Sequence, residues 1–220
     1  MKNINLKSAL FFLLGISLAT YFALFALQGV DPSFITAIKF LPQVVSIDVI
    51  VVSLFSSYAW KWFIFRGWLV PFPNLNGTWK GFINTTWVDP KTGERPASIP
   101  AMITVKQSFL NISVVMRTGE MTSRSCTADF ILDKENQLCR LCYTYDSNPM
   151  QTVKDRSPNH CGTMLFDITG KKQKELEGEY WTGRKSTGNV KLSFWKRKLV
   201  DSYPTELGEH PVSAIRDNKS

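Results

Sequence analysis

The chain has 220 residues, a formal net charge of +8 and four cysteines. This length suffices for one hydrophobic core plus a membrane element and is short for two soluble domains. No G-x-S-x-G, P-loop or H-E-x-x-H motif occurs, and the two histidines are His160 and His210. An enzyme is therefore not expected, although a Ser/His/Asp site around His160 is a weakly supported alternative.

The first predicted element is an apolar segment at residues 8–30, "SALFFLLGISLATYFALFALQGV", which contains no charged residue. About 20 apolar residues suffice for a helix to span the hydrocarbon core of a bilayer. A cleavable signal peptide is the alternative, since it also begins with lysines and an apolar run. We favour a membrane helix because the run exceeds the usual apolar region of a signal peptide and a second apolar run follows.

The second predicted membrane helix covers residues 40–60 and contains several polar residues. At 100° per residue, Gln43, Ser46, Ser53 and Ser57 fall within a sector of roughly 80°. Such a stripe is typical of membrane helices that pack closely and bond to one another. Asp48 points away from the stripe and should face a partner, a cavity or the headgroup region, or snorkel at the interface. These five residues are the candidates for helix association.

Basic residues predict the orientation of this two-helix hairpin, which we assign to residues 1–68. Lys2 and Lys7 precede the first helix, and Lys61 and Arg66 follow the second. By the positive-inside rule, both ends of the hairpin are cytoplasmic and the short intervening loop is outside. The aromatic belt at the cytoplasmic face is expected to comprise Trp60, Trp62 and Trp68.

A proline-containing linker at residues 69–75, "LVPFPNL", separates the hairpin from a segment of different character. Prolines and their neighbours favour an extended, semi-rigid chain. From residue 76 to 199 the apolar residues alternate with polar ones in short runs that turn signals separate. The remaining residues, 200–220, are expected to form a loose polar tail.

Eight candidate strands and no convincing helix indicate an all-β domain in this second segment. Eight strands close an up-and-down barrel whose interior is filled by side chains or holds one small ligand. The predicted architecture is therefore a membrane α-helical hairpin followed by an eight-stranded antiparallel barrel. The strands are predicted at 77–87, 98–107, 109–117, 121–132, 137–146, 160–169, 175–183 and 188–198.

The cysteines Cys139 and Cys142 form a C-x-x-C pair, which raises the alternative of a zinc site with Cys126, Cys161 or His160. Within a strand, however, a spacing of three places two side chains on opposite faces. We therefore expect reduced thiols and no metal site.

Aromatic residues predict a ligand-binding interior. Strict alternation places Trp79, Gly81 and Ile83 on one face of the first strand. By the same rule Leu141, Tyr143 and Tyr145 share a face, as do Gly178, Tyr180 and Thr182, with Arg184 at the strand exit. A barrel lined by tyrosines, with arginines at its mouth, can stack bases and neutralise phosphates.

Further residues are candidates for the rim of the same barrel end. Arg117 and Arg124 flank the third hairpin, and Asn148 is expected in the longest internal loop. The alternative for the aromatic residues is ordinary filling of the barrel, with Trp79 as a plug of one end. The alternative for the arginines is a solvated surface.

Two strings, L-x-Y-x-Y-x-x-N-P at 141–149 and L-x-G-x-Y-W-T-x-R at 176–184, carry a resemblance together with the order of the elements. The chain resembles the bacterial two-transmembrane β-barrel effector family, also known as CD-NTase-associated protein fifteen. That family is associated with SMODS-type nucleotidyltransferases in CBASS antiphage defence. The resemblance extends from the first helix to about Leu199.

The resemblance implies a lipocalin-like cytosolic barrel that binds a cyclic oligonucleotide made by a partner CD-NTase synthetase. It further implies no catalytic residue, no cofactor, no DNA or RNA partner, and a multi-pass protein of the bacterial inner membrane. Binding of the messenger would drive homo-oligomerisation, membrane disruption and cell death. The candidate ligand-binding residues are Tyr143, Tyr145, Asn148, Tyr180, Thr182 and Arg184, with Arg117, Arg124 and Trp79 added from the barrel pattern.

Two other functions remain open from the residues. The first is a membrane-anchored lipocalin-like carrier or sensor of an apolar small molecule, which would have a uniformly apolar cavity. The second is a structural adaptor that binds another protein, which would expose an apolar patch and have no pocket.

Overall fold

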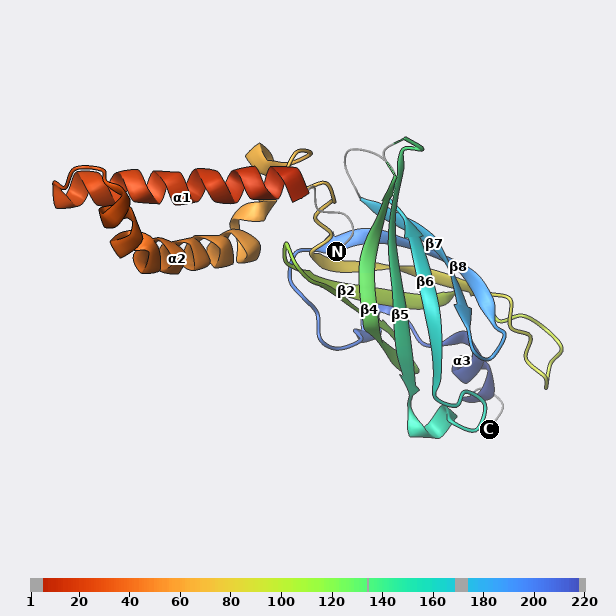
Figure 1. The fold of residues 1–220 in the computed structure, drawn as a ribbon. Helices are drawn as coiled ribbons and strands as arrows, with labels where there is room; N and C mark the ends of the chain where they lie inside the picture. The colour runs from red at the N-terminus through yellow and green to blue at the C-terminus, as the bar shows by residue number, and fades with distance from the viewer. Residues whose placement is uncertain (1–5, 134, 169–173, 218–220) are drawn as a thin grey trace. The chain divides into compact units, whose positions relative to one another are not determined.

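The computed structural model describes residues 6–133, 135–168 and 174–217, and the chain divides into two compact units. One unit comprises the chain up to Phe72 together with Ser108–Leu110, and the other comprises the remainder. Figure 1 shows the helices of the first unit and the barrel of the second. Lys2 and the predicted turn at 169–172 lie outside the described residues.

The first unit contains two long apolar helices, α1 (Leu6–Gln28) and α2 (Phe34–Ser57). By length and composition, both are long and apolar enough to cross a membrane. The second helix begins six residues before the predicted span, because Ser33 caps its start by accepting a hydrogen bond from the Thr36 amide. It ends at Ser57, and the short helices η1 (Ala59–Lys61) and η2 (Phe63–Phe65) follow.

The polar residues of α2 divide between its exposed and its packed faces. All four residues of the predicted stripe, Gln43, Ser46, Ser53 and Ser57, are exposed. The hydroxyl of Ser53 donates to the Val49 carbonyl of its own helix at 2.7 Å. Asp48, by contrast, is half-buried and accepts a hydrogen bond of 2.6 Å from the Ser17 hydroxyl of α1. Asp48 therefore faces the neighbouring helix, and the stripe is available to another partner.

Trp60 does not belong to an exposed aromatic belt. Its side chain is 1% exposed and packs in an apolar cluster with Phe55, Leu69 and Val70. The belt assignment is wrong for this residue because the chain turns back after α2 and buries the indole. Trp62 and Trp68 are 62% and 45% exposed. The first two residues of the predicted linker, Leu69 and Val70, are likewise part of this cluster.

The second unit is a closed barrel of eight antiparallel strands in sequence order, and β1 pairs with β8 to close it. This confirms the predicted fold class. The strands are β1 (Gly77–Thr85), β2 (Ile99–Gln107), β3 (Ile112–Thr118), β4 (Met121–Asp133), β5 (Leu138–Pro149), β6 (His160–Asp167), β7 (Glu175–Thr182) and β8 (Thr187–Lys196).

Trp79 fills the end of the barrel at which β1 begins. Its side chain is 1% exposed, and its indole N–H donates to the Leu75 carbonyl at 3.0 Å. Phe194 packs edge-on against the same ring. The one polar group of the indole is hydrogen-bonded to a backbone carbonyl. Trp79 therefore fills this end of the barrel without leaving a buried donor unsatisfied. The alternative of Trp79 as a plug is thus the correct one.

The segment after β8 is bound to the barrel wall. The Thr78 hydroxyl donates to the Lys198 carbonyl at 2.7 Å, and the Thr104 hydroxyl donates to the Val200 carbonyl at 2.7 Å. A short helix η4 (Thr205–Leu207) and helix α3 (Pro211–Asp217) follow, and His210 and Val212 are buried. Figure 1 shows α3 at the end of the barrel where β5 finishes. The expectation of a loose tail is wrong for residues 200–214.

A first prediction concerns Gly81 of β1, which lies close to the backbone of β8. A Cβ at this position would lie 2.0 Å from the Lys191 carbonyl oxygen and 2.9 Å from the Leu192 Cα, both backbone atoms that cannot move independently. Gly81→Ala should lower the free energy of unfolding of the barrel by about 1–3 kcal/mol. Urea denaturation followed by tryptophan fluorescence measures this change.

Gly183→Ala is the matched control, because a Cβ there would meet its nearest neighbour at an ordinary 3.7 Å. An equal loss of stability in both variants would contradict the close approach of β1 to β8 at Gly81.

Candidate ligand-binding site

A cavity of about 860 Å³, including the space open at its mouth, occupies the end of the barrel at which β1 finishes. The residues that line it come from seven of the strands, β1 to β7, and from the loops and C-terminal segment at this end. Trp79 and its neighbours fill the opposite end, so the cavity has a floor and one mouth. This arrangement is typical of small barrels that hold one ligand.

Two tyrosines form the aromatic walls of the cavity, and each lies over a glycine of the next strand. Tyr145 of β5 is paired with Gly162 of β6, and Tyr180 of β7 is paired with Gly188 of β8. A Cβ on Gly162 would lie 2.6 Å from the Tyr145 ring, and one on Gly188 would lie 2.7 Å from the Tyr180 ring. The glycines therefore let both rings lie close to the wall and leave space between them.

Both cavity tyrosines are neutral phenols at physiological pH. Burial raises the pKa of Tyr145 and, to a smaller degree, neighbouring Tyr180 raises it further. Burial also raises the pKa of Tyr180. The rings are therefore suited to stacking and to neutral hydrogen bonds, rather than to holding a cation as phenolates.

Arg184 is the principal cation of the cavity. It follows β7. Its Nη1 donates a hydrogen bond of 2.9 Å to the Ser157 hydroxyl, and its Nη2 lies 3.4 Å from Nε2 of His160. Burial lowers its pKa from 12.5, but a guanidinium remains charged at neutral pH. Among the described residues, no carboxylate lies within ion-pair distance of it.

His160 supports this arginine as a neutral imidazole. Burial lowers its pKa, and the positive charge of Arg184 adds to that effect against the opposing bond to Pro158. Its Nδ1–H donates to the Pro158 carbonyl at 3.0 Å. Nε2 is then the unprotonated nitrogen that faces Arg184.

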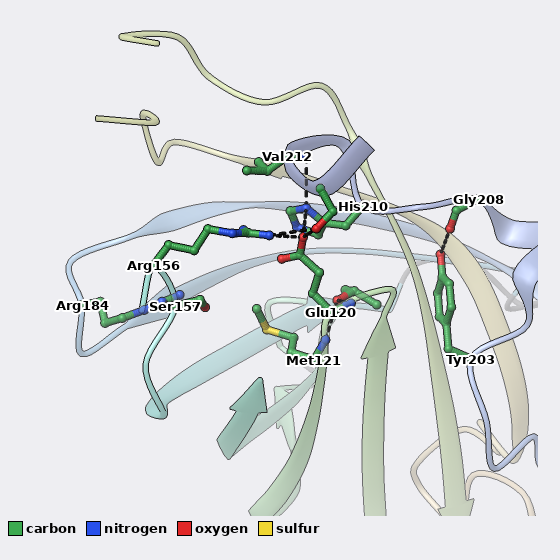
Figure 2. A network of polar contacts seen from close by, with 11 residues as sticks. Glu120, Met121, Arg156, Ser157, Arg184, Tyr203, Gly208, His210 and Val212 are labelled. Atoms are coloured by element: carbon green, nitrogen blue, oxygen red, sulfur yellow. Dashed lines mark hydrogen bonds and ion pairs between the residues drawn. The ribbon is translucent and has the colours of Figure 1, made fainter. Parts of the chain in front are cut away.

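A buried ionic network closes the mouth on the other side, and Figure 2 shows it. Oε1 of Glu120, in the β3–β4 turn, accepts bonds from Arg156 Nη2, from the Ser213 hydroxyl at 2.5 Å and from His210 Nδ1 at 3.0 Å. Burial alone would raise the pKa of Glu120, but the bonds from His210, Arg156 and Ser213 outweigh it and lower the pKa to about 2. The carboxylate is therefore ionised and ties the C-terminal segment to the barrel.

Four of the predicted binding residues line this cavity: Tyr145, Tyr180, Thr182 and Arg184. The Thr182 hydroxyl is bonded to the Ser186 hydroxyl at 2.7 Å. Tyr143 points inward from the same strand as Tyr145 but lies deeper, among residues of the core. Its hydroxyl is buried without a hydrogen-bond partner among the described residues.

The other four predicted residues do not lie at the cavity. Trp79 is at the opposite end of the barrel. Arg117 and Arg124 point outward, since they alternate with the buried Met116, Thr118 and Ser123 of β3 and β4. Asn148 is exposed on the outer face of β5, which continues to Pro149 where a loop was expected. The assignment of Arg117, Arg124 and Asn148 to the rim of the cavity is wrong because the pleat directs these three side chains to the outer surface.

Glu120, Arg156, Ser157 and His210 are cavity residues that the sequence did not reveal. They come from a tight turn, a loop and the C-terminal segment, none of which has a periodic pattern. The one sequence signal for these residues was the group of charged residues in the long loop between β5 and β6, which includes Arg156.

A second prediction follows from the depressed pKa of Glu120. A carboxyl with a folded-state pKa near 2, against an ordinary value of 4.5, stabilises the protein above pH 4.5 and loses this contribution as pH falls towards 2. The full contribution is on the order of 3 kcal/mol. The difference in unfolding free energy between wild type and Glu120→Gln should therefore be constant above pH 5 and shrink at lower pH. A difference that stays constant down to pH 3 would contradict the ionised network.

Comparison with known proteins identifies relatives of the chain. A family model described as "Cap15, cyclic dinucleotide receptor domain" matches residues 70–194, more than half of the chain. The chain is also similar to "CD-NTase-associated protein 15" of Staphylococcus schleiferi, with 29% identity over 155 residues. That match covers 70% of this chain and 79% of the relative. The resemblance noted in the sequence is thereby confirmed.

Proposed function

Because the chain belongs to the Cap15 cyclic dinucleotide receptor family, we propose that its barrel cavity binds a cyclic dinucleotide and that the protein is a non-catalytic effector of CBASS antiphage defence. The observation that carries this proposal is the combination of Arg184, which lines the cavity without an acidic partner among the described residues, with Tyr145 and Tyr180 in the same cavity. A cyclic dinucleotide has matching groups: two anionic phosphates and two bases with stacking faces.

The cavity chemistry favours a nucleotide over an apolar ligand. Arg156, Arg184, Ser123, Ser147 and Thr182 all line it. An apolar molecule would desolvate the Arg184 guanidinium without offering it a hydrogen bond, which costs free energy. A nucleotide phosphate would instead gain charge-assisted bonds from a guanidinium, and a base would gain stacking on a tyrosine.

We propose that the exposed stripe of α2 acts in the effector step. A ligand can promote assembly only if it binds the oligomer more tightly than the monomer. In an oligomer, the stripe residues Gln43, Ser46, Ser53 and Ser57 would be available for helix–helix packing, since they are exposed in the single chain. Assembly of such hairpins in the bacterial inner membrane, with both termini cytoplasmic, would breach the membrane and kill the infected cell. A CD-NTase synthetase would supply the messenger.

A third prediction tests the ligand site through Arg184. Arg184→Gln should weaken binding of the cognate cyclic dinucleotide about 10- to 100-fold, because a hydrogen-bonded charge pair with phosphate is lost. Isothermal titration calorimetry of the full chain in detergent measures this, with cyclic di-AMP, cyclic di-GMP, cyclic GMP–AMP and cyclic UMP–AMP as the ligands.

Arg124→Gln is the matched control, since Arg124 is an exposed arginine on the outer face of β4. It should leave the affinity unchanged. A loss with Arg124→Gln, but not with Arg184→Gln, would move the site to the outer surface. Binding of fatty acids in place of all four nucleotides would favour the apolar carrier.

A fourth prediction tests the α2 stripe. Replacement of Gln43, Ser46, Ser53 and Ser57 by Leu should abolish ligand-dependent crosslinking into oligomers and cell killing, while nucleotide binding persists. The control replaces Val45, Val49 and Val52 by Leu, because these residues are exposed on another side of α2. Killing that survives in the stripe variant would show that the stripe has no part in assembly.

A further inference from the structure

The carboxylate of Glu120 has one saturated oxygen and one oxygen without a partner. Oε1 accepts from Arg156, Ser213 and His210. Oε2 is buried and has no hydrogen-bond partner among the described residues. The residue is 3% exposed and lines the cavity.

An ionised oxygen in this position needs an explanation, because a buried acceptor without a donor is costly and more so when it is charged. The three bonds to Oε1 hold the group ionised, so it can only accept hydrogen bonds. The negative charge of a bound phosphate diester would also repel the Glu120 carboxylate, so a phosphate oxygen is not the partner of Oε2. An N–H or O–H group of a bound ligand would supply the missing donor to Oε2.

The geometry fixes this oxygen in place. The Glu120 amide donates to the Thr118 hydroxyl at 3.3 Å, and its carbonyl accepts from the Met150 amide at 2.8 Å. Together with the three bonds to Oε1, these contacts prevent rotation of the carboxylate. Figure 2 shows Oε2 turned away from His210, towards the side on which Ser157 and Arg184 lie. Both of those residues line the cavity.

We propose that Oε2 of Glu120 accepts a hydrogen bond from the exocyclic amine of a base, so that Glu120 selects cyclic dinucleotides that contain adenine, cytosine or guanine. This inference rests on the proposed function and assigns a base-reading residue to its site. Arg184 holds phosphate, Tyr145 and Tyr180 stack bases, and Glu120 reads a base edge.

An amine fits a single free oxygen better than the other donors of the ligand. The ring N–H of uracil lies between two carbonyl oxygens, which the carboxylate would repel. An exocyclic amine projects beyond the ring and presents one hydrogen to one acceptor. Ribose hydroxyls are the remaining donors, and the test below separates them from the bases.

The test compares each nucleotide with a counterpart that lacks the amine, using calorimetry on the full chain in detergent. Cyclic di-AMP is paired with its purine analogue and cyclic di-GMP with its inosine analogue. Wild type should bind the better ligand about 10- to 100-fold more tightly than its counterpart without the amine. Glu120→Gln, which presents an amide N–H₂ in place of Oε2, should remove most of that preference.

Glu209→Gln is the control, because Glu209 is exposed in the same C-terminal segment. It should keep the wild-type preference. Thermal melting of each variant verifies that it is folded, and the comparison of ligands on wild type stands even if Glu120→Gln is unstable.

Three results would overturn the proposal. The first is equal binding by wild type of a nucleotide and its counterpart without the amine, and the second is an unchanged preference in Glu120→Gln. The third concerns the ribose. If removal of the 2′-hydroxyl from the ligand lowers its affinity for wild type as much as Glu120→Gln lowers the affinity for the intact ligand, Oε2 binds a ribose hydroxyl instead of a base. If no cyclic dinucleotide binds wild type at all, the proposed function fails and not only this inference.

Discussion

Closure of the barrel fixes the direction of every side chain in the second unit. Because β1 pairs with β8, each strand has two neighbours, and alternate residues point into an interior of limited width. Large inward side chains then require small ones beside them. Glycines meet this need at three cross-strand pairs, where Gly162 adjoins Tyr145, Gly188 adjoins Tyr180 and Gly178 adjoins Phe166. The cavity exists because two of these rings lie against the wall at one end while Trp79 fills the other.

The two arginines at the mouth of the cavity have different partners and different roles. Arg156 is neutralised by Glu120, and this pair binds the C-terminal segment through His210 and Ser213. Arg184 has neutral partners instead, a serine hydroxyl and an imidazole whose pKa is lowered by burial. The Arg156 guanidinium thus holds the C-terminal segment at the mouth, and the Arg184 guanidinium keeps its charge available for a ligand anion. If both arginines were paired with Glu120, neither guanidinium would have its charge available for a ligand.

The sequence predicted the fold well because the fold depends on periodicity. Apolar runs of more than 20 residues and eight alternating segments are local signals, and the predicted inward faces of β1, β5 and β7 agree with the observed pleat. Half of the candidate site was also accessible in this way, since Tyr145, Tyr180, Thr182 and Arg184 follow from alternation along two strands. Glu120, Arg156 and His210 were missed because they meet only when a turn, a loop and the C-terminal segment converge. Asn148 was misplaced because β5 extends further than its turn residues suggested.

The measurement that tests the nucleotide site most directly is a crystal structure of the full chain with the cyclic dinucleotide that binds it most tightly. Density for the bases beside Tyr145 and Tyr180, with a phosphate within hydrogen-bond distance of the Arg184 guanidinium, is the predicted result. Ligand density on the outer surface near Arg124 and Asn148, or a cavity that closes around Arg184 without ligand, would contradict it.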